Sequence, residues 1–296
     1  MLWIPVTLIG ALAQTGRNMA QAGLTRSLGT LGATQVRFLY GLPFALLFLG
    51  LTCLIGGVLP PVPSPRAVAV ITLGGLAQIG ATALMLATME RRSFAVSTAW
   101  LKTEPVLIAI GGALVLGDSL SAAQIAGVVI ATAGVVLTGW RRGAASGIGP
   151  VLTGLAAAAG FGLSAIAFRA GILALGDGGF FLRSMTALVL SLASQVVLLA
   201  LWLRLFRPGS MTATLGQWRG SLAAGLLGAF GSAMWFTAFS LATAAQVRTL
   251  ALVEVLLAAA LGWAMRGERP SGRSLAGMAV IVAGVGVLLL ASQGGS

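Results

Sequence analysis

The sequence has 296 residues, of which 58% are hydrophobic and 8% are charged. A soluble globule of this size needs more polar residues to cover its surface, so the composition excludes a soluble protein and places the chain in a lipid bilayer. The net charge is +12, there is one cysteine and there is no histidine, which excludes an intrachain disulfide, a His/Cys metal site and a histidine relay. We expect the basic residues to set topology and contact lipid headgroups, with no binding of nucleic acid.

About 20 apolar residues cross the hydrocarbon core as a helix, and this length predicts an all-α integral membrane protein with ten spans. The predicted spans cover residues 2–24, 34–55, 67–89, 94–116, 122–140, 149–171, 180–203, 217–241, 244–265 and 273–291. Gly29 and Gly32 predict the first break, and the glycines of 176–179 predict a later one. We expect a first half over residues 1–140, a linker over 141–149 and a second half over 150–296.

An internal repeat relates the two halves. Residues 97–137 match residues 247–287 without a gap, so that Glu104 falls on Glu254 and Asp118 falls on Glu268. Each half has five predicted spans, and because five is an odd number, the second half enters the membrane from the opposite side. Inverted repeats of this kind place a substrate cavity near the midplane of the membrane. Most of the basic residues lie in the odd-numbered connections between spans. This distribution favours a cytoplasmic location for those connections and places both termini outside.

Four repeated glycines predict close helix packing. Gly127 and Gly134 are seven residues apart on the fifth predicted span, and Gly277 and Gly284 repeat this spacing on the tenth. Small residues on one face let two helices approach closely, so we expect these two spans to pack together. Asp118 and Glu268 precede the same two spans, where a carboxylate caps exposed N–H groups.

Ionisable residues inside the spans are the first candidates for function, because a charge at bilayer depth is costly and needs a partner. They are Arg17, Lys102, Glu104, Arg169, Arg248 and Glu254. With four cations and two anions, they predict spare positive charge in the interior. Two roles are open for Glu104: it handles substrate or protons, or it forms a structural ion pair. Arg169 and Arg248 lie near span ends, where snorkelling to the interface is an alternative.

Lys102 is the only lysine among 18 basic residues, which indicates either a need for a compact, titratable amine or simple packing with its amine on backbone carbonyls. It lies on a different helix face from Glu104, so the two are not expected to pair. Trp100 and Ser97 share a face with Glu104. Ser97, Trp100 and Glu104 together are expected to give one helix face a hydroxyl, an aromatic ring and a carboxylate.

A polar stripe on the first span is the second candidate feature. Gln14, Arg17 and Asn18 recur at three- and four-residue spacing, which indicates either the lining of an aqueous path or hydrogen bonding between helices. Shorter polar and aromatic groups on the third, sixth and eighth spans add Gln78, Thr82, Ser164, Phe168 and Trp235.

Several motifs occur together: Glu104-Pro105, the hairpins Gly117-Asp118 and Gly267-Glu268, and the Ala-Gly pairs that end at Gly127, Gly134, Gly277 and Gly284. With the inverted repeat, they resemble the EamA-type members of the drug/metabolite transporter superfamily, and most of all the bacterial amino-acid exporters, including the aromatic amino-acid type. The resemblance implies a ten-helix exporter with a central cavity that works by alternating access. The second copy reads Glu254-Val255, so proline loosens the helix in the first copy only.

We therefore expect a bacterial inner-membrane secondary transporter that exports small amphipathic metabolites, above all amino acids. Gln14, Asn18, Gln78 and Ser164 are expected to hydrogen-bond the substrate, Trp100 and Trp235 to stack on it, and a cation to receive its carboxylate. We expect no cofactor, and a monomer, because two fused halves replace a dimer. A proton-driven exporter of organic cations through Glu104 is the alternative, and an intramembrane enzyme is a remote one.

Overall fold

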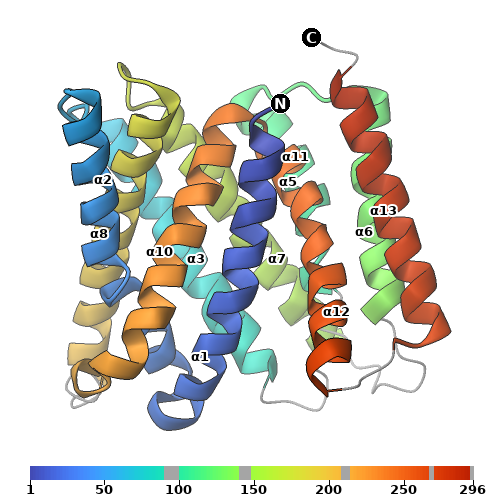
Figure 1. Ribbon diagram of the computed structural model, residues 1–296, viewed down its shortest axis with the longest axis horizontal. Helices are drawn as coiled ribbons and strands as arrows, with labels where there is room; N and C mark the ends of the chain where they lie inside the picture. Colours follow the sequence, from blue (N-terminus) through green and yellow to red (C-terminus); the bar gives the residue numbers. More distant parts are fainter. Residues whose placement is uncertain (90–99, 140–147, 208–213, 267–269, 294–296) are drawn as a thin grey trace. The chain divides into compact units, whose positions relative to one another are not determined.

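The computed structural model describes the backbone of residues 1–89, 100–139, 148–207, 214–266 and 270–293. Within these stretches it does not describe the side chains of residues 18–31, 33, 86–89, 139, 148, 150, 258, 261, 262, 265 and 266. Every regular element in the described stretches is helical (Figure 1). Ser97, Trp140, residues 141–147 of the predicted linker and Glu268 lie outside them.

The helix bounds follow the apolar runs of the sequence. The helices are α1 (Trp3–Leu39), α2 (Leu42–Gly56), α3 (Pro65–Met89), α5 (Glu104–Leu116), α6 (Ala122–Gly139), α7 (Ile148–Leu173), α8 (Phe180–Phe206), α10 (Trp218–Leu241), α11 (Ala244–Leu250), the 3₁₀ turn η1 (Ala251–Val253), α12 (Glu254–Arg266) and α13 (Gly272–Gln293). Six described segments are long and apolar enough to cross a bilayer: Thr34–Gly56, Pro65–Met85, Val151–Leu173, Phe180–Phe206, Trp218–Leu241 and Gly272–Gln293. The helices indicate a multi-pass membrane protein, while ten spans in inverted repeats stay a prediction.

The predicted break at Gly29 and Gly32 is wrong. The α1 helix continues through both glycines for 37 residues, about 55 Å at the usual rise per residue. An isolated glycine costs a helix only about 1 kcal/mol, so it does not by itself end one. The interruption falls instead at Tyr40 and Gly41, just before Pro43, which has no N–H to donate to the preceding turn.

The chain forms two compact units, and each combines segments from both predicted halves. The first unit comprises Met1–Ile79 and Ala167–Leu241, and the second comprises Gly80–Ile166 and Ala242–Ser296. Two of the three boundaries fall inside α3 and inside α7, and the third falls between α10 and α11. Nine arginines and a single carboxylate, that of Asp177, belong to the first unit, whereas the other five of the six acidic residues belong to the second.

In the first unit, three glycines on α10 let α1 pack directly against it. A Cβ added to Gly225 would lie 2.6 Å from the carbonyl oxygen of Tyr40, and one added to Gly231 would lie 3.5 Å from the Cβ of Ala13. Gly228, between them, faces the side-chain stems of Arg17 and Arg37. The spacing of three residues keeps all three glycines on the same side of α10.

In the second unit, α6 and α13 lie side by side (Figure 1), with the four repeated glycines at their contact. A Cβ on Gly127 would lie 2.8 Å from the Gly284 carbonyl oxygen, and one on Gly134 would lie 2.6 Å from the Ile281 nitrogen. Gly277 meets Thr138 in the same way. The two backbones therefore touch where the sequence has glycine.

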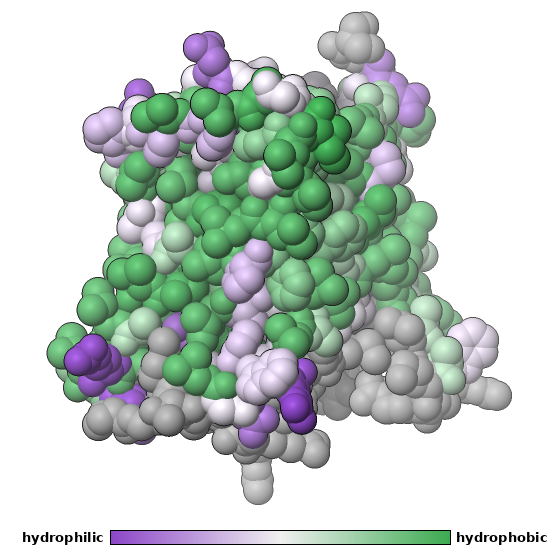
Figure 2. All heavy atoms as spheres, turned by 60° about the vertical axis from the view of Figure 1, so that its left-hand side comes forward, coloured by the Kyte–Doolittle hydropathy of each residue, from purple (hydrophilic) through white to green (hydrophobic). Residues whose placement is uncertain are grey.

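The outward faces of the helices are apolar, as a lipid solvent requires. Within α2 only Ala45 is buried, while Leu54 is 80% exposed and Ile55 is 85% exposed. Figure 2 shows hydrophobic side chains over the middle of the visible face and hydrophilic ones gathered toward its upper and lower ends. This distribution fits a chain whose middle lies in hydrocarbon and whose ends meet the headgroups.

Replacing Gly284 with alanine should destabilise the second unit. The added Cβ would press on the backbone nitrogen of Ala131, and overpacking of this kind costs about 1 to 3 kcal/mol. We expect a lower thermal unfolding midpoint in detergent. Gly286 is the matched control on the same helix, since a Cβ there meets nothing within 4 Å. Equal midpoints for the two alanine variants would contradict this account of the helix contact.

Candidate functional site

Both repeated glutamates begin a helix in the second unit, each directly after an interruption. Before Glu104 the chain makes a turn in which the Thr103 amide and hydroxyl both donate to the Trp100 carbonyl oxygen, at 3.1 and 2.7 Å. Glu104 then opens α5, with Pro105 in its first turn. Proline fits that position, where an N–H would have no helical acceptor.

The expectation of an interruption in the first copy alone is wrong. The predicted ninth span divides into α11, the 3₁₀ turn η1 and α12, and α12 begins at Glu254 without a proline. The cap N–H of Glu254 donates to Ala251 and Leu252, which tightens the last turn before the helix restarts. The local sequence holds no proline or glycine at this turn, and Glu254, the first residue after it, pairs with Lys102.

Glu104 forms a two-pronged ion pair with Arg248 of α11. The Arg248 Nε donates to one carboxylate oxygen at 2.8 Å, and its Nη2 donates to the other at 2.7 Å. The Glu104 side chain is 8% exposed and the Arg248 side chain 20% exposed. Snorkelling of Arg248 to the interface is therefore wrong, because its guanidinium is turned to a carboxylate in the interior of the unit.

The Lys102 amine forms an ion pair with Glu254. The sequence analysis had instead allowed for an amine bonded to backbone carbonyls in simple packing. The two ion pairs cross between the repeats, because each glutamate binds a cation from the other copy. We call Lys102, Glu104, Arg248 and Glu254 the charged cluster. Its two cations and two anions balance, so the expectation of spare interior positive charge does not hold for this cluster.

The structure places the other predicted residues as follows. In the second unit Thr82 and Ser164 are buried and Trp100 is half-buried. In the first unit Gln14 and Gln78 are half-buried and Arg17, Phe168 and Trp235 are buried, while the Asn18 side chain lies outside the described residues. The rings of Phe168 and Phe236 are tilted against each other with centroids 4.8 Å apart, and the rings of Trp235 and Phe239 are stacked with centroids 6.4 Å apart. Each aromatic ring thus has a neighbour in its own unit.

Arg169 bonds a backbone carbonyl of its own unit, and the Asp118 backbone takes part in ending α5. The Arg169 Nη1 donates to the carbonyl oxygen of Phe239 at 2.6 Å within the first unit. Its guanidinium therefore has a protein partner in addition to any contact with the membrane interface. The Asp118 amide donates to the Gly112 carbonyl and closes the end of α5, after Gly117 with a φ of 67°. At the N-terminus of α6 the Ser121 hydroxyl accepts from the Gln124 backbone N–H at 3.2 Å.

Gln195 is one of several buried polar residues that the sequence analysis did not name. Gln195 lies on α8 with 0% exposure, and its Nε2 donates to Gln78 Oε1 at 2.7 Å. The available signal was an amide in the middle of a 27-residue apolar helix. Thr186 and Ser194 on the same helix bond backbone carbonyls of that helix, whereas Gln195 reaches across to α3.

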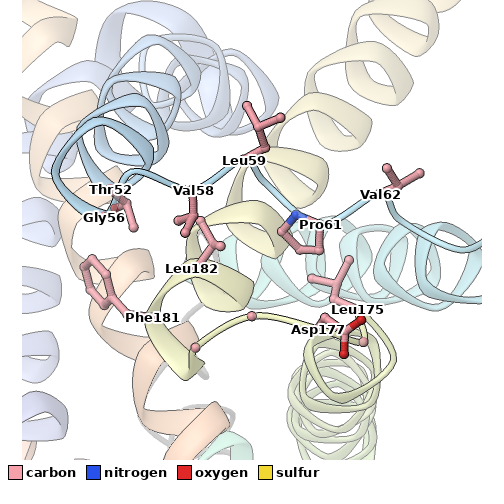
Figure 3. A pocket seen from close by; sticks show the side chains of 13 residues that line it. Thr52, Gly56, Val58, Leu59, Pro61, Val62, Leu175, Asp177, Phe181 and Leu182 are labelled. Carbon is pink, nitrogen blue, oxygen red and sulfur yellow. The ribbon is translucent and has the colours of Figure 1, made fainter.

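A separate hollow of about 800 Å³ lies in the first unit between the α2–α3 connection and the α7–α8 turn (Figure 3). Among the described residues that line it, Asp177 is the one with a charge, and its neighbours include Leu59, Phe181 and Leu182. The turn that carries Asp177 depends on Gly176 and Gly178, whose φ angles are 69° and 122°. No residue predicted to bind substrate lines this hollow.

Comparisons with known proteins address the fold and the family. Residues 149–290 match the family described as the EamA-like transporter family, so this part of the chain is an EamA-like domain of the drug/metabolite transporter superfamily. A solved structure titled "Crystal structure of protein" matches with 20% identity over 99% of each chain and a TM-score of 0.72, which shows a shared fold. No curated protein matches the chain.

Replacing Glu104 with glutamine should destabilise the protein, because Arg248 is left as a desolvated cation without its carboxylate. Breaking a fully buried pair costs about 3 to 5 kcal/mol, and the partial exposure of Arg248 places this case at or below about 3 kcal/mol. Thermal unfolding in detergent measures the loss.

The double variant Glu104→Gln with Arg248→Gln removes both charges and should recover much of the lost stability. Arg219→Gln, which removes an exposed arginine lying over the Trp218 ring, serves as the control for loss of positive charge. Additive losses in the double variant would show that the two side chains are not energetically coupled.

Proposed function

We propose that the chain is a secondary transporter that exports small amphipathic metabolites, and amino acids above all, across a bacterial inner membrane by alternating access. The EamA-like domain at residues 149–290 indicates a membrane transporter of small molecules. The apolar helices supply the spans that such a transporter needs. The amino-acid substrate is our own inference and depends on the charged cluster.

The observation that carries this inference is the balance of charge in the cluster. Two cations and two carboxylates form ion pairs in a largely buried place. A zwitterionic amino acid brings one charge of each sign, so it can exchange with these pairs and leave the total charge at zero. A substrate with net charge would add an unbalanced charge to a site where desolvation is costly.

The chemistry of exchange assigns a role to each member. Arg248 and Lys102 are the donors for the substrate carboxylate, and Glu104 and Glu254 are the acceptors for its ammonium group. The Trp100 ring, on the turn before Glu104, offers a surface for an apolar side chain. Ion pairs that open for substrate and close without it supply two states of the kind that alternating access needs.

Export of organic cations driven by protons through Glu104 is less well supported. Both carboxylate oxygens of Glu104 accept from Arg248, so a cationic substrate would compete with a two-pronged guanidinium. It would also leave Arg248 without its partner. An amino acid supplies a carboxylate for Arg248 at the same time as an ammonium group for Glu104.

Counterflow in proteoliposomes tests the proposal. Vesicles loaded with unlabelled L-phenylalanine or L-leucine should accumulate the labelled amino acid, and Glu254→Gln should reduce this uptake about 10- to 100-fold, the value of a lost charge-assisted hydrogen bond. Arg219→Gln should leave uptake unchanged. Uptake of a hydrophobic organic cation with no uptake of any amino acid would overturn the proposed substrate class and favour the proton-coupled alternative.

A further inference from the structure

A second hollow, of about 510 Å³, lies entirely within the second unit. Val106, in the first turn of α5, forms part of its wall. Most of the wall is one face of α6, because the lining residues of that helix recur at three- and four-residue spacing. These α6 residues are Val129, Thr132, Ala133, Val136 and Leu137. No member of the charged cluster is among the described residues that line this hollow.

The α6 face of this hollow is apolar and faces outward. Val129 is 51% exposed and Ala133 is exposed as well. In a chain whose helices cross a bilayer, an apolar hollow on an exposed helix face meets acyl chains rather than water. The stretch from Val129 to Leu137 covers about 12 Å of α6 at the usual rise per residue. This length is close to the depth of one leaflet, which is half of a hydrocarbon core about 30 Å thick.

A single cation, Arg273, stands at one end of this apolar face, among the described lining residues. The helices α6 and α13 run in opposite directions. Gly277, near the start of α13, meets Thr138 near the end of α6. Gly284, further along α13, meets Ala131, which comes earlier on α6. The start of α13, which carries Arg273, therefore lies beside the end of α6.

The first turn of α13 adds hydrogen-bond donors next to the Arg273 guanidinium. The backbone N–H of Leu275 donates to the Ser271 carbonyl, so the amides of Gly272 and Arg273 come before the helical ladder begins. A Cβ added to Gly272 would meet nothing within 4 Å, which leaves open space beside these amides. A guanidinium next to the positive end of a helix favours an anionic group, and a phosphate fits both kinds of donor.

We propose that this hollow binds one acyl chain of an anionic phospholipid, whose phosphate is held by Arg273 and the first amides of α13. Every phospholipid carries acyl chains, so the apolar wall seats the lipid and Arg273 selects a headgroup with net negative charge. Under the topology predicted from the basic residues, the start of α13 faces the cytoplasm. Basic pockets between membrane helices bind anionic headgroups on that side. The site does not depend on the class of substrate that is transported.

Native mass spectrometry of the full chain in detergent tests the selection of the headgroup. The probes are dioleoyl phosphatidylglycerol and dioleoyl phosphatidylcholine, which have the same chains and differ in net charge. We expect the wild-type protein to retain one phosphatidylglycerol in preference to phosphatidylcholine. Arg273→Gln should weaken phosphatidylglycerol binding about fivefold, the effect of about 1 kcal/mol for one basic residue near a membrane surface.

Arg219→Gln is the control for this measurement, because it removes another exposed arginine that lies in the first unit. It should leave phosphatidylglycerol binding unchanged. Equal binding of the two lipids by the wild-type protein would overturn the proposal, and so would equal effects of Arg273→Gln and Arg219→Gln.

Val129→Trp tests whether the acyl chain lies in the hollow. The indole ring would occupy the end of the hollow away from Arg273, so we expect weaker phosphatidylglycerol binding although the positive charge is retained. Val282→Trp is the matched control, since Val282 is 53% exposed on α13 and is not among the described lining residues. Equal lipid binding by the two tryptophan variants would overturn the proposal.

Glycerol 3-phosphate separates a lipid site from a simple anion site, because it carries the phosphate without acyl chains. In equimolar competition it should not displace phosphatidylglycerol from the wild-type protein. Displacement would show that the start of α13 binds phosphate without the hollow, and would overturn the assignment to a lipid.

Discussion

The structure of the second unit depends on the rule that a charge inside a membrane protein needs a partner. Glu104 with Arg248 and Lys102 with Glu254 satisfy this rule across the two sequence repeats, so neither copy balances its own carboxylate. The pairs connect the start of α5 to α11 and the start of α12. Ionic contacts of this kind join segments that are about 150 residues apart in the sequence and make the interrupted helices one assembly.

Glycine supplies the close packing that surrounds these charges. The contact of α6 with α13 brings backbone against backbone at Gly127, Gly134, Gly277 and Gly284, and the contact of α1 with α10 does the same at Gly225. Lipid gives helices no hydrophobic reason to associate, so close van der Waals contact takes that role. Larger apolar side chains can then face outward, as they do on α2.

Apolar runs alone predicted several helices to within a few residues, including α3, α8, α10 and α13, because the length of a run and the turn residues at its ends are local properties. The 3₁₀ turn before Glu254 was not predictable in the same way, because the local sequence holds no helix breaker there. The partner of Arg248 was not predictable either, because it lies 144 residues away in the sequence. Gln195 was missed because an isolated amide on an apolar helix has no periodicity. The sequence analysis named Asp118 as a cap of α6 and missed the Ser121 cap, although the spacing of Ser121 and Gln124 indicated a capping box.

The central claim is that a balanced set of ion pairs accepts a zwitterion by exchanging partners. A structure determined with bound L-phenylalanine tests it most directly. The account predicts the α-carboxylate within hydrogen-bonding distance of Arg248 or Lys102 and the α-ammonium group against Glu104 or Glu254, with at least one of the two ion pairs opened. Phenylalanine bound elsewhere in the protein, with both ion pairs intact, would contradict it.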